Sequence, residues 1–162
     1  MTYPRLGRGE RALFNPAFMG LVCARTVREH RVHNERCPLA IAVTAAVMAL
    51  QPGIRAVLPK TTSASVAKWV EDNEEIRIMM AANTTALAPV VRAGLLFATQ
   101  TGVLTAHPDA TVSLATPRAI PAQPRGEAPI ALAIQKAAGM FGRWLPTAGS
   151  TSTTLTLLGV RP

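Results

Sequence analysis

The stretch Gly94–Leu114, GLLFATQTGVLTAHPDATVSL, combines the signals of a helix and of two strands. Up to Gln100 its apolar residues follow helical spacing, and Gly102 stands where a residue in the left-handed conformation commonly ends a helix. Val103–Thr105 and Thr111–Leu114 are rich in β-branched residues and flank a loop of strong turn formers. The stretch therefore predicts a helix that leads directly into a small β-hairpin.

Short helices are expected before this hairpin, within residues 60–115. Thr61–Ser63 can cap the first of them, and Asn73 can cap the second. Thr84–Thr85 is expected to interrupt the second helix, and Pro89 to begin a third, because proline fits the first helical position. Three short helices followed by a hairpin are typical of a winged helix-turn-helix, so the sequence predicts a winged-helix-like unit.

Two more helices are expected nearer the N-terminus. Asn15 can cap a helix whose first residue is Pro16 and which ends near His30. Pro38 begins the next helix, which is apolar on almost every side as far as Leu50. A helix without a polar face is typical of a central, buried position.

The remaining chain completes a mainly α organisation. Residues 116–126 are rich in proline and polar side chains, which favours a stiff linker outside the core. A further helix is expected after it, and Ser150–Leu158 is either a strand or a serine-capped helix. The predicted parts are a flexible basic arm, a helical core with the winged-helix-like hairpin, a Pro-rich linker and a C-terminal helical segment, at residues 1–13, 14–115, 116–126 and 127–162.

Few residues of the chain are charged, and most of the charged residues are positive. Only 16% of the residues are charged, yet the formal net charge is +8 at pH 7. Such a surface favours an acidic partner, either nucleic acid or an acidic protein face. Most of the basic residues are arginines, which suit phosphate contacts and protein interfaces alike, so composition does not choose between these partners.

The sequence favours a cytoplasmic protein with no membrane segment. The longest apolar run, Cys37–Leu50, is shorter than the roughly 20 residues that span a bilayer. The N-terminus lacks the continuous apolar region of a secretory signal. Two cysteines in a chain of this length do not form a disulfide framework, which is consistent with a reducing compartment.

Motifs of enzymatic chemistry are missing from the sequence. No glycine-rich loop ends in Lys-Ser or Lys-Thr, and there is no Gly-x-Ser-x-Gly elbow, so neither nucleotide hydrolysis nor a serine hydrolase is expected. We therefore predict no catalytic residues and no cofactor. A weak candidate for a metal site consists of four soft ligands, Cys23, His30, His33 and Cys37. The set lacks the usual close cysteine pair, so a buried cysteine with surface histidines is the favoured interpretation.

Basic residues gather on the first helix. Arg25, Arg28 and Arg31 alternate with acidic residues, which is typical of a solvated helix face but also suits docking to an acidic partner. Both interpretations stay open. A DNA-binding winged helix would carry its basic residues on the third helix and the hairpin, but residues 89–114 contain only Arg92 and no lysine.

The order of several short motifs resembles the middle component of bacterial three-component ABC-ATPase systems, a group that includes Lamassu-type antiphage defence. The resemblance extends over about residues 11 to 162. The motifs are Asn15-Pro16-Ala17-Phe18, the apolar helix after Pro38, Leu58-Pro59 before the helix that contains Trp69, Leu95-Leu96-Phe97 leading to Gly102-Val103-Leu104, Gly142-Arg143-Trp144 and the ending Leu158-Gly159-Val160-Arg161-Pro162.

This resemblance implies a non-enzymatic subunit that binds an SMC-like ABC ATPase and couples it to an effector, often a nuclease. DNA would then be reached through the complex. The alternative is a stand-alone winged-helix DNA-binding regulator, and a small metalloenzyme ranks below both. Under the first hypothesis apolar side chains such as Trp144 should be exposed, and the candidate partner-binding residues are Arg25, Arg28, Arg31, Arg143, Trp144 and Arg161.

Overall fold

The computed structural model describes residue 8 and residues 13–161, and it confirms a mainly α fold with a small antiparallel sheet. The predicted basic arm, residues 1–13, lies outside the described residues except at 8 and 13. The helices are α2 (Pro16–His30), α3 (Leu39–Ala49), α4 (Pro52–Arg55), α5 (Val66–Asp72), α6 (Glu75–Gln100), α7 (Pro129–Trp144), the 3-10 helix η1 (Leu145–Ala148) and α8 (Thr151–Leu157).

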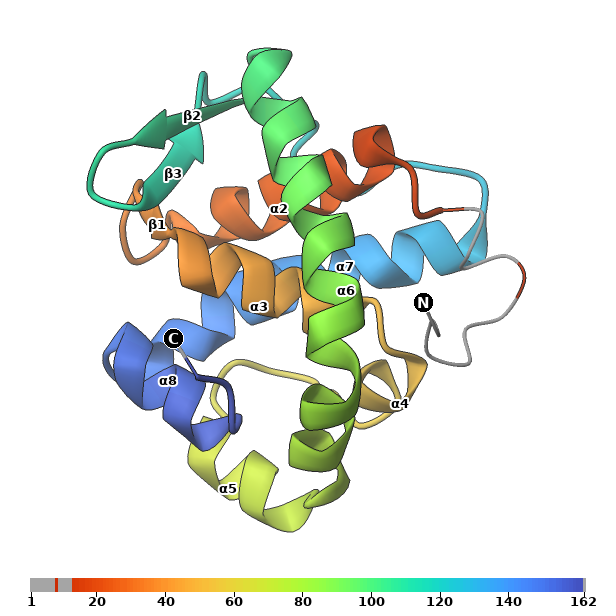
Figure 1. Ribbon diagram of the computed structural model, residues 1–162, viewed down its shortest axis with the longest axis vertical. Helices are drawn as coiled ribbons and strands as arrows, with labels where there is room; N and C mark the ends of the chain where they lie inside the picture. Colours follow the sequence, from red (N-terminus) through yellow and green to blue (C-terminus); the bar gives the residue numbers. More distant parts are fainter. Residues whose placement is uncertain (1–7, 9–12, 162) are drawn as a thin grey trace.

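Helix α6 runs along the length of the molecule, and the other elements are arranged around it (Figure 1). The hairpin lies beside its C-terminal end, and α5 leads into its N-terminal end. Helices α2 and α7 cross the molecule and pack against each other, while α3 packs on α2, α6 and α7. Helix α2 therefore lies at the centre of the fold, between α6 and α7.

Glycines allow these helices to approach α2 very closely. A Cβ atom at Gly94 of α6 would lie 2.3 Å from the Cβ of Met19 and 2.7 Å from the backbone nitrogen of Gly20. On the α7 side, a Cβ atom at Gly142 would lie 2.4 Å from the carbonyl oxygen of Thr26. Real Cβ atoms do not come this close to backbone, so both crossings require glycine.

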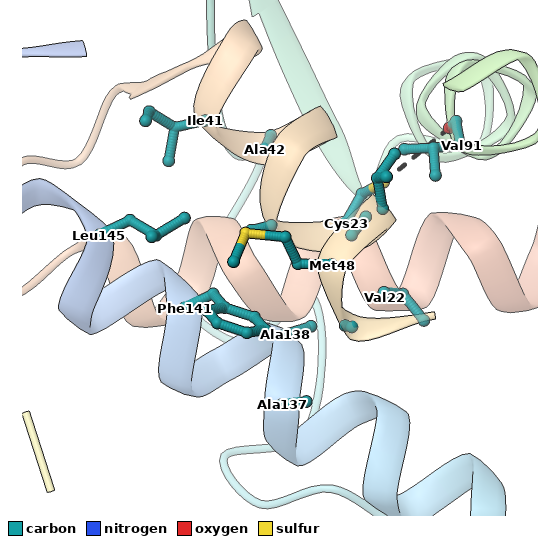
Figure 2. Packing of buried hydrophobic residues seen from close by; sticks show 14 of the residues in the cluster. Val22, Cys23, Ile41, Ala42, Met48, Val91, Ala137, Ala138, Phe141 and Leu145 are labelled. Carbon is teal, nitrogen blue, oxygen red and sulfur yellow. Dashed lines mark hydrogen bonds between the residues drawn. The ribbon is translucent and has the colours of Figure 1, made fainter. Parts of the chain in front are cut away.

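Small and aliphatic side chains fill the core between these helices (Figure 2). Met48 of α3 is fully buried and lies close to Phe141 of α7. Cys23 of α2 is also fully buried, and its thiol donates a weak hydrogen bond to the carbonyl of Val91 in α6. The prediction of a buried α3 without a polar face is confirmed over most of its length.

Three aromatic rings, those of Trp69, Phe141 and Trp144, pack together within this core. The ring of Trp144 meets that of Trp69 edge-on at 5.0 Å between centroids and stacks on Phe141 at 6.4 Å. Trp144 is fully buried, and its indole nitrogen donates a hydrogen bond of 2.7 Å to the carbonyl of Ala64. The expectation that Trp144 is exposed is therefore wrong, because its ring and its one polar atom are both satisfied inside the domain.

The predicted hairpin is present, and a third short strand joins it. Strand β2 (Leu104–His107) pairs with β3 (Thr111–Leu114), with Leu104 opposite Leu114. Strand β1 (Cys37–Pro38) pairs with the other edge of β3, giving the order β1-β3-β2. Gly102 has φ of 78°, as expected for the residue that ends the preceding helix.

Of the three short helices expected within residues 60–115, the first is present as α5, but the second and third are wrong. Helix α6 is continuous from Glu75 to Gln100, so Thr84–Thr85 does not interrupt it and Pro89 lies inside it. The Thr84 hydroxyl donates to the carbonyl of Met80 within the helix. Pro89 and Thr85 are both exposed, so water can reach the carbonyl that Pro89 leaves without a donor. The winged-helix-like unit is accordingly not confirmed.

The helix caps predicted at Thr61–Ser63 and at Asn73 are not formed by these residues. The hydroxyls of Thr61 and Ser63 lie 2.6 Å apart and bond each other, and the cap of α5 is Ser65, whose hydroxyl accepts from the amide of Lys68 at 3.3 Å. Asn73 follows α5 at its C-terminal end, where its amide donates to the carbonyl of Trp69. Both sets of side chains thus bond other local groups than the helix amides that a cap would serve.

The C-terminal part of the chain packs into the same core. Residues 116–126 contain neither helix nor strand, and the buried residue among them is Ile120, which is 7% exposed and belongs to the core cluster. The predicted domain boundaries stay a prediction. Ser150 caps α8, its hydroxyl accepting from the amide of Thr153 at 3.1 Å, which decides the ambiguous tail in favour of a helix.

Helix α6 is the one described helix that is long and apolar enough, by length and composition, to cross a membrane. The longest apolar run of the sequence, Cys37–Leu50, lies outside this helix. One face of α6 is buried against α2 and α3, at residues such as Val91 and Leu95. This packing accounts for only part of the apolar content of α6, since 33% of its apolar window is buried.

The close crossing of α2 and α6 predicts that Gly94→Ala lowers the free energy of unfolding by about 2–3 kcal/mol, because its methyl group meets backbone and Cβ atoms of α2 that cannot move alone. Urea unfolding followed by circular dichroism measures this loss. Gly53→Ala is the matched control. Its Cβ would meet only the flexible end of Met79, so its stability should stay within about 1 kcal/mol of wild type. Equal effects of the two substitutions would contradict the proposed contact.

Candidate functional site

An apolar groove lies between α3, α6 and α8 and encloses a volume of about 570 Å³. Leu39, Ala40 and Val43, in the first turns of α3, form one wall. Leu155 of α8 forms part of the opposite wall. The groove exists because α3 is apolar on almost all sides, while the neighbouring helices cover only part of its first turn, so that Leu39 remains 38% exposed.

Two arginines lie at this groove. Arg92 enters it from α6 and Arg161 from the C-terminal segment, and both are exposed. The groove is therefore suited to a partner segment that combines apolar side chains with negative charge. Arg161 is a residue that the sequence predicted for partner binding, whereas Arg92 was noted only as the single basic residue of its region.

The same face of α6 carries further exposed apolar surface. Thr84, Ala88 and Arg92 line the groove at intervals of four residues, and Leu96 continues this series. Leu96 is 59% exposed, and its neighbour Phe97 is 39% exposed. The apolar surface therefore extends beyond the groove along α6 toward the hairpin.

A second, basic pocket of about 480 Å³ lies between α2 and α7. Arg25 and Arg28 line it from α2, and Lys136 and Arg143 line it from α7. Gly139 makes the close packing of the two helices possible, since a Cβ atom there would lie 3.1 Å from Glu29 Cγ. Three of the sequence-predicted arginines thus come together at one place.

Glu29 is the acidic residue among those that line this pocket, and its side chain connects the α2 wall to the α7 wall. Its carboxylate accepts hydrogen bonds from Arg28 at 3.0 Å and from Arg143 at 2.8 Å, while only 17% of its side chain is exposed. Each carboxylate oxygen bonds one guanidinium, so Glu29 joins α2 to α7. A half-buried bridge of this kind holds both arginines in fixed positions.

Arg25 is the most deeply buried of these cations, with 1% of its surface exposed. Its Nη1 donates to the carbonyl of Ala122 at 3.1 Å, whereas Nε and Nη2 have no hydrogen-bond partner among the described residues. Burial, and secondly the positive charge of Arg28, lower the pKa of Arg25, and Glu29 opposes them. Gln135 Oε1 is likewise buried without a partner beside this pocket.

Arg31 lies apart from this pocket. It pairs loosely with Glu35 at 4.0 Å, in the i,i+4 arrangement expected of a solvated helix face. Trp144 belongs to the aromatic core described above. Sequence reasoning missed Lys136 and Gln135, although their spacing from Arg143 along α7 would have placed them on one helix face.

The four candidate metal ligands are not brought together. A ring nitrogen of His30 donates to the carbonyl of Asn34 at 2.8 Å, and one of His33 donates to the carbonyl of Arg143 at 2.7 Å. Cys23 and Cys37 are free and buried. Within the part of the chain that the structure describes, no group of three or more His, Cys, Asp or Glu residues could hold a metal ion.

A helical domain with an apolar groove and a basic pocket, each lined by several elements, has the features of a small binding domain. The chain belongs to the ABC-three component (ABC-3C) system Middle Component 3 family, whose model matches residues 6–162. This match confirms the resemblance to the middle components of three-component ABC systems. Comparison with curated proteins and with solved structures found no match.

Burial predicts that both cysteines are inert in the folded chain. Burial raises the pKa of Cys23 and of Cys37 to about 12, so at pH 8 only about one thiol in ten thousand is a thiolate. We expect Ellman's reagent to react with neither cysteine at pH 8 until urea unfolds the chain, after which both react. Rapid reaction of the folded chain would show that one of these thiols is accessible.

Proposed function

We propose that this middle component is a non-enzymatic assembly subunit that binds an SMC-like ABC ATPase and couples it to an effector in a bacterial antiphage defence system. The observation that carries the proposal is the apolar groove between α3, α6 and α8, in a chain that belongs to a middle-component family. A monomeric domain seldom leaves such a surface open unless a partner covers it.

The occupant that the groove fits best is an apolar segment of the ATPase with acidic flanking residues. Leu39 and Val43 supply apolar contact area, and Arg92 and Arg161 supply positive charge at the edge. The formal net charge of +8 of the whole chain would also speed its association with an acidic surface. The effector would then contact other surfaces of the same complex.

This assignment places the protein in the cytoplasm, where an ATP-hydrolysing partner has its nucleotide. It also makes DNA a ligand of the complex as a whole. The stand-alone DNA-binding alternative has less support, because α6 is one continuous helix and the hairpin segment Leu104–Leu114 carries no Lys or Arg. The long helix leaves no short recognition helix beside the hairpin.

The groove can be tested by co-expression with the products of the neighbouring genes. We expect an ABC ATPase to co-purify with the wild-type chain at high salt. Leu39→Asp should reduce the recovered ATPase roughly tenfold or more, because it places a carboxylate against an acidic, apolar segment. Arg92→Glu should act in the same direction by reversing a charge at the edge of the groove.

Val32→Asp is the matched control, since Val32 is 68% exposed and does not line the groove. It should leave ATPase recovery unchanged. Circular dichroism of each purified variant checks that the fold is retained. Unchanged recovery with Leu39→Asp would remove the groove from the interface. If no ATPase co-purifies, and the lone chain binds short duplexes with a steep dependence on salt, the DNA-binding alternative is correct.

A further inference from the structure

The basic pocket between α2 and α7 is not used by the proposed docking at the groove, and its chemistry points to a ligand of its own. Four cationic side chains line it, and Glu29 is the carboxylate among the lining residues. Glu29 is already shared between Arg28 and Arg143. Arg25 and Lys136 therefore contribute positive charge that no lining carboxylate balances.

The orientation of Arg25 is fixed before any ligand arrives. Its Nη1 is bonded to the carbonyl of Ala122, which leaves Nε and Nη2 as the remaining donors on one edge of the guanidinium. This edge is the one that binds two oxygens of a phosphate or carboxylate at once. A side chain that is 99% buried and keeps this edge without a partner loses free energy that a bound oxyanion would restore.

The neighbouring groups indicate more than a bare carboxylate. The surplus of cations favours a dianion, and a phosphate monoester carries nearly two negative charges at neutral pH. The side-chain oxygen of Gln135, which is buried and has no partner in the described part of the chain, can accept a hydrogen bond from a hydroxyl group of the same ligand.

The volume of the pocket sets the size of the ligand. About 480 Å³ is within the range of small-molecule sites and exceeds what a phosphate group alone fills. Gln123 and Lys136, both exposed, form part of the wall. Both donors of the Arg25 edge are themselves buried, so an anion that reaches them has to displace side chains of the pocket wall.

We propose that this pocket binds a small phosphomonoester, with its phosphate held by the Nε and Nη2 edge of Arg25 and by Lys136, and its organic part lying toward Gln135. Binding is assigned to the middle component itself, independently of its protein partners. The site is formed entirely by residues of this chain, so the isolated protein suffices to test it.

Titration calorimetry at pH 8 and constant ionic strength, adjusted with sodium chloride, tests the proposal with inorganic phosphate and with ribose 5-phosphate. We expect both to bind, and ribose 5-phosphate to bind more tightly because it fills more of the pocket. Arg25→Met should weaken both roughly tenfold or more, and Lys136→Gln should weaken them several-fold. Lys60→Gln removes the same charge from an exposed loop position and should change neither affinity.

Thermal unfolding separates loss of the site from loss of the fold. Arg25→Met replaces a buried, partly unsatisfied cation with an apolar side chain, so its midpoint in chloride should be no lower than that of wild type. Phosphate should raise the midpoint of wild type but not of this variant. Should Arg25→Met fail to fold, Arg25→Lys keeps the charge without the forked edge and is expected to lose phosphate binding in the same way.

Two results would overturn the proposal. The first is phosphate binding that is absent, or equal in wild type, Arg25→Met and Lys136→Gln. The second is displacement of phosphate by a DNA duplex or an acidic peptide while ribose 5-phosphate does not bind, which would assign the pocket to a macromolecule.

Discussion

The contact of α2 with α6 and α7 through glycine is the constraint on which the rest of the fold depends. Gly94 brings α6 against the backbone of α2, and Gly142 brings α7 against it from the other side. With no side chain between these backbones, the distance between the helices is fixed. One wall of the apolar groove and one wall of the basic pocket are therefore both positioned through α2.

Local signals in the sequence sufficed where a single side chain decides the structure. Asn15 and Gly102 act as the pattern predicts, because each satisfies or redirects backbone within one turn of itself. Ser150 caps a helix, which is one of the two structures that the sequence left open for its segment. The same reasoning failed at Thr84–Thr85 and Pro89, where the local preference for a break is weaker than the burial of the flanking residues of α6. Whether burial outweighs the local preference for a break can be judged only when the elements that pack against the helix are known.

The residues of the candidate sites also divide into those that the sequence indicated and those that it did not. Charge and spacing along the sequence indicated Arg25 and Arg28, the family resemblance indicated Arg143, and the structure places all three at one pocket. The spacing along α7 places Gln135 on the face of Arg143, but the sequence alone could not indicate that this face meets Arg25 and Arg28. Nor could it indicate that Trp144 would be enclosed by other aromatic rings. Those facts depend on how α2, α5 and α7 meet in space, which no periodicity within one helix encodes.

The continuity of α6 has a mechanical consequence. A helix from Glu75 to Gln100 is roughly 40 Å long, and it crosses α2 at Gly94, close to one of its ends. A small tilt about that crossing would move the distant N-terminal end, next to α5, much further than the end beside the hairpin. The buried side chains of Ile76, Met80 and Leu87 hold this longer part of the helix in the core, so the direction of α6 is fixed by them together with the crossing at Gly94.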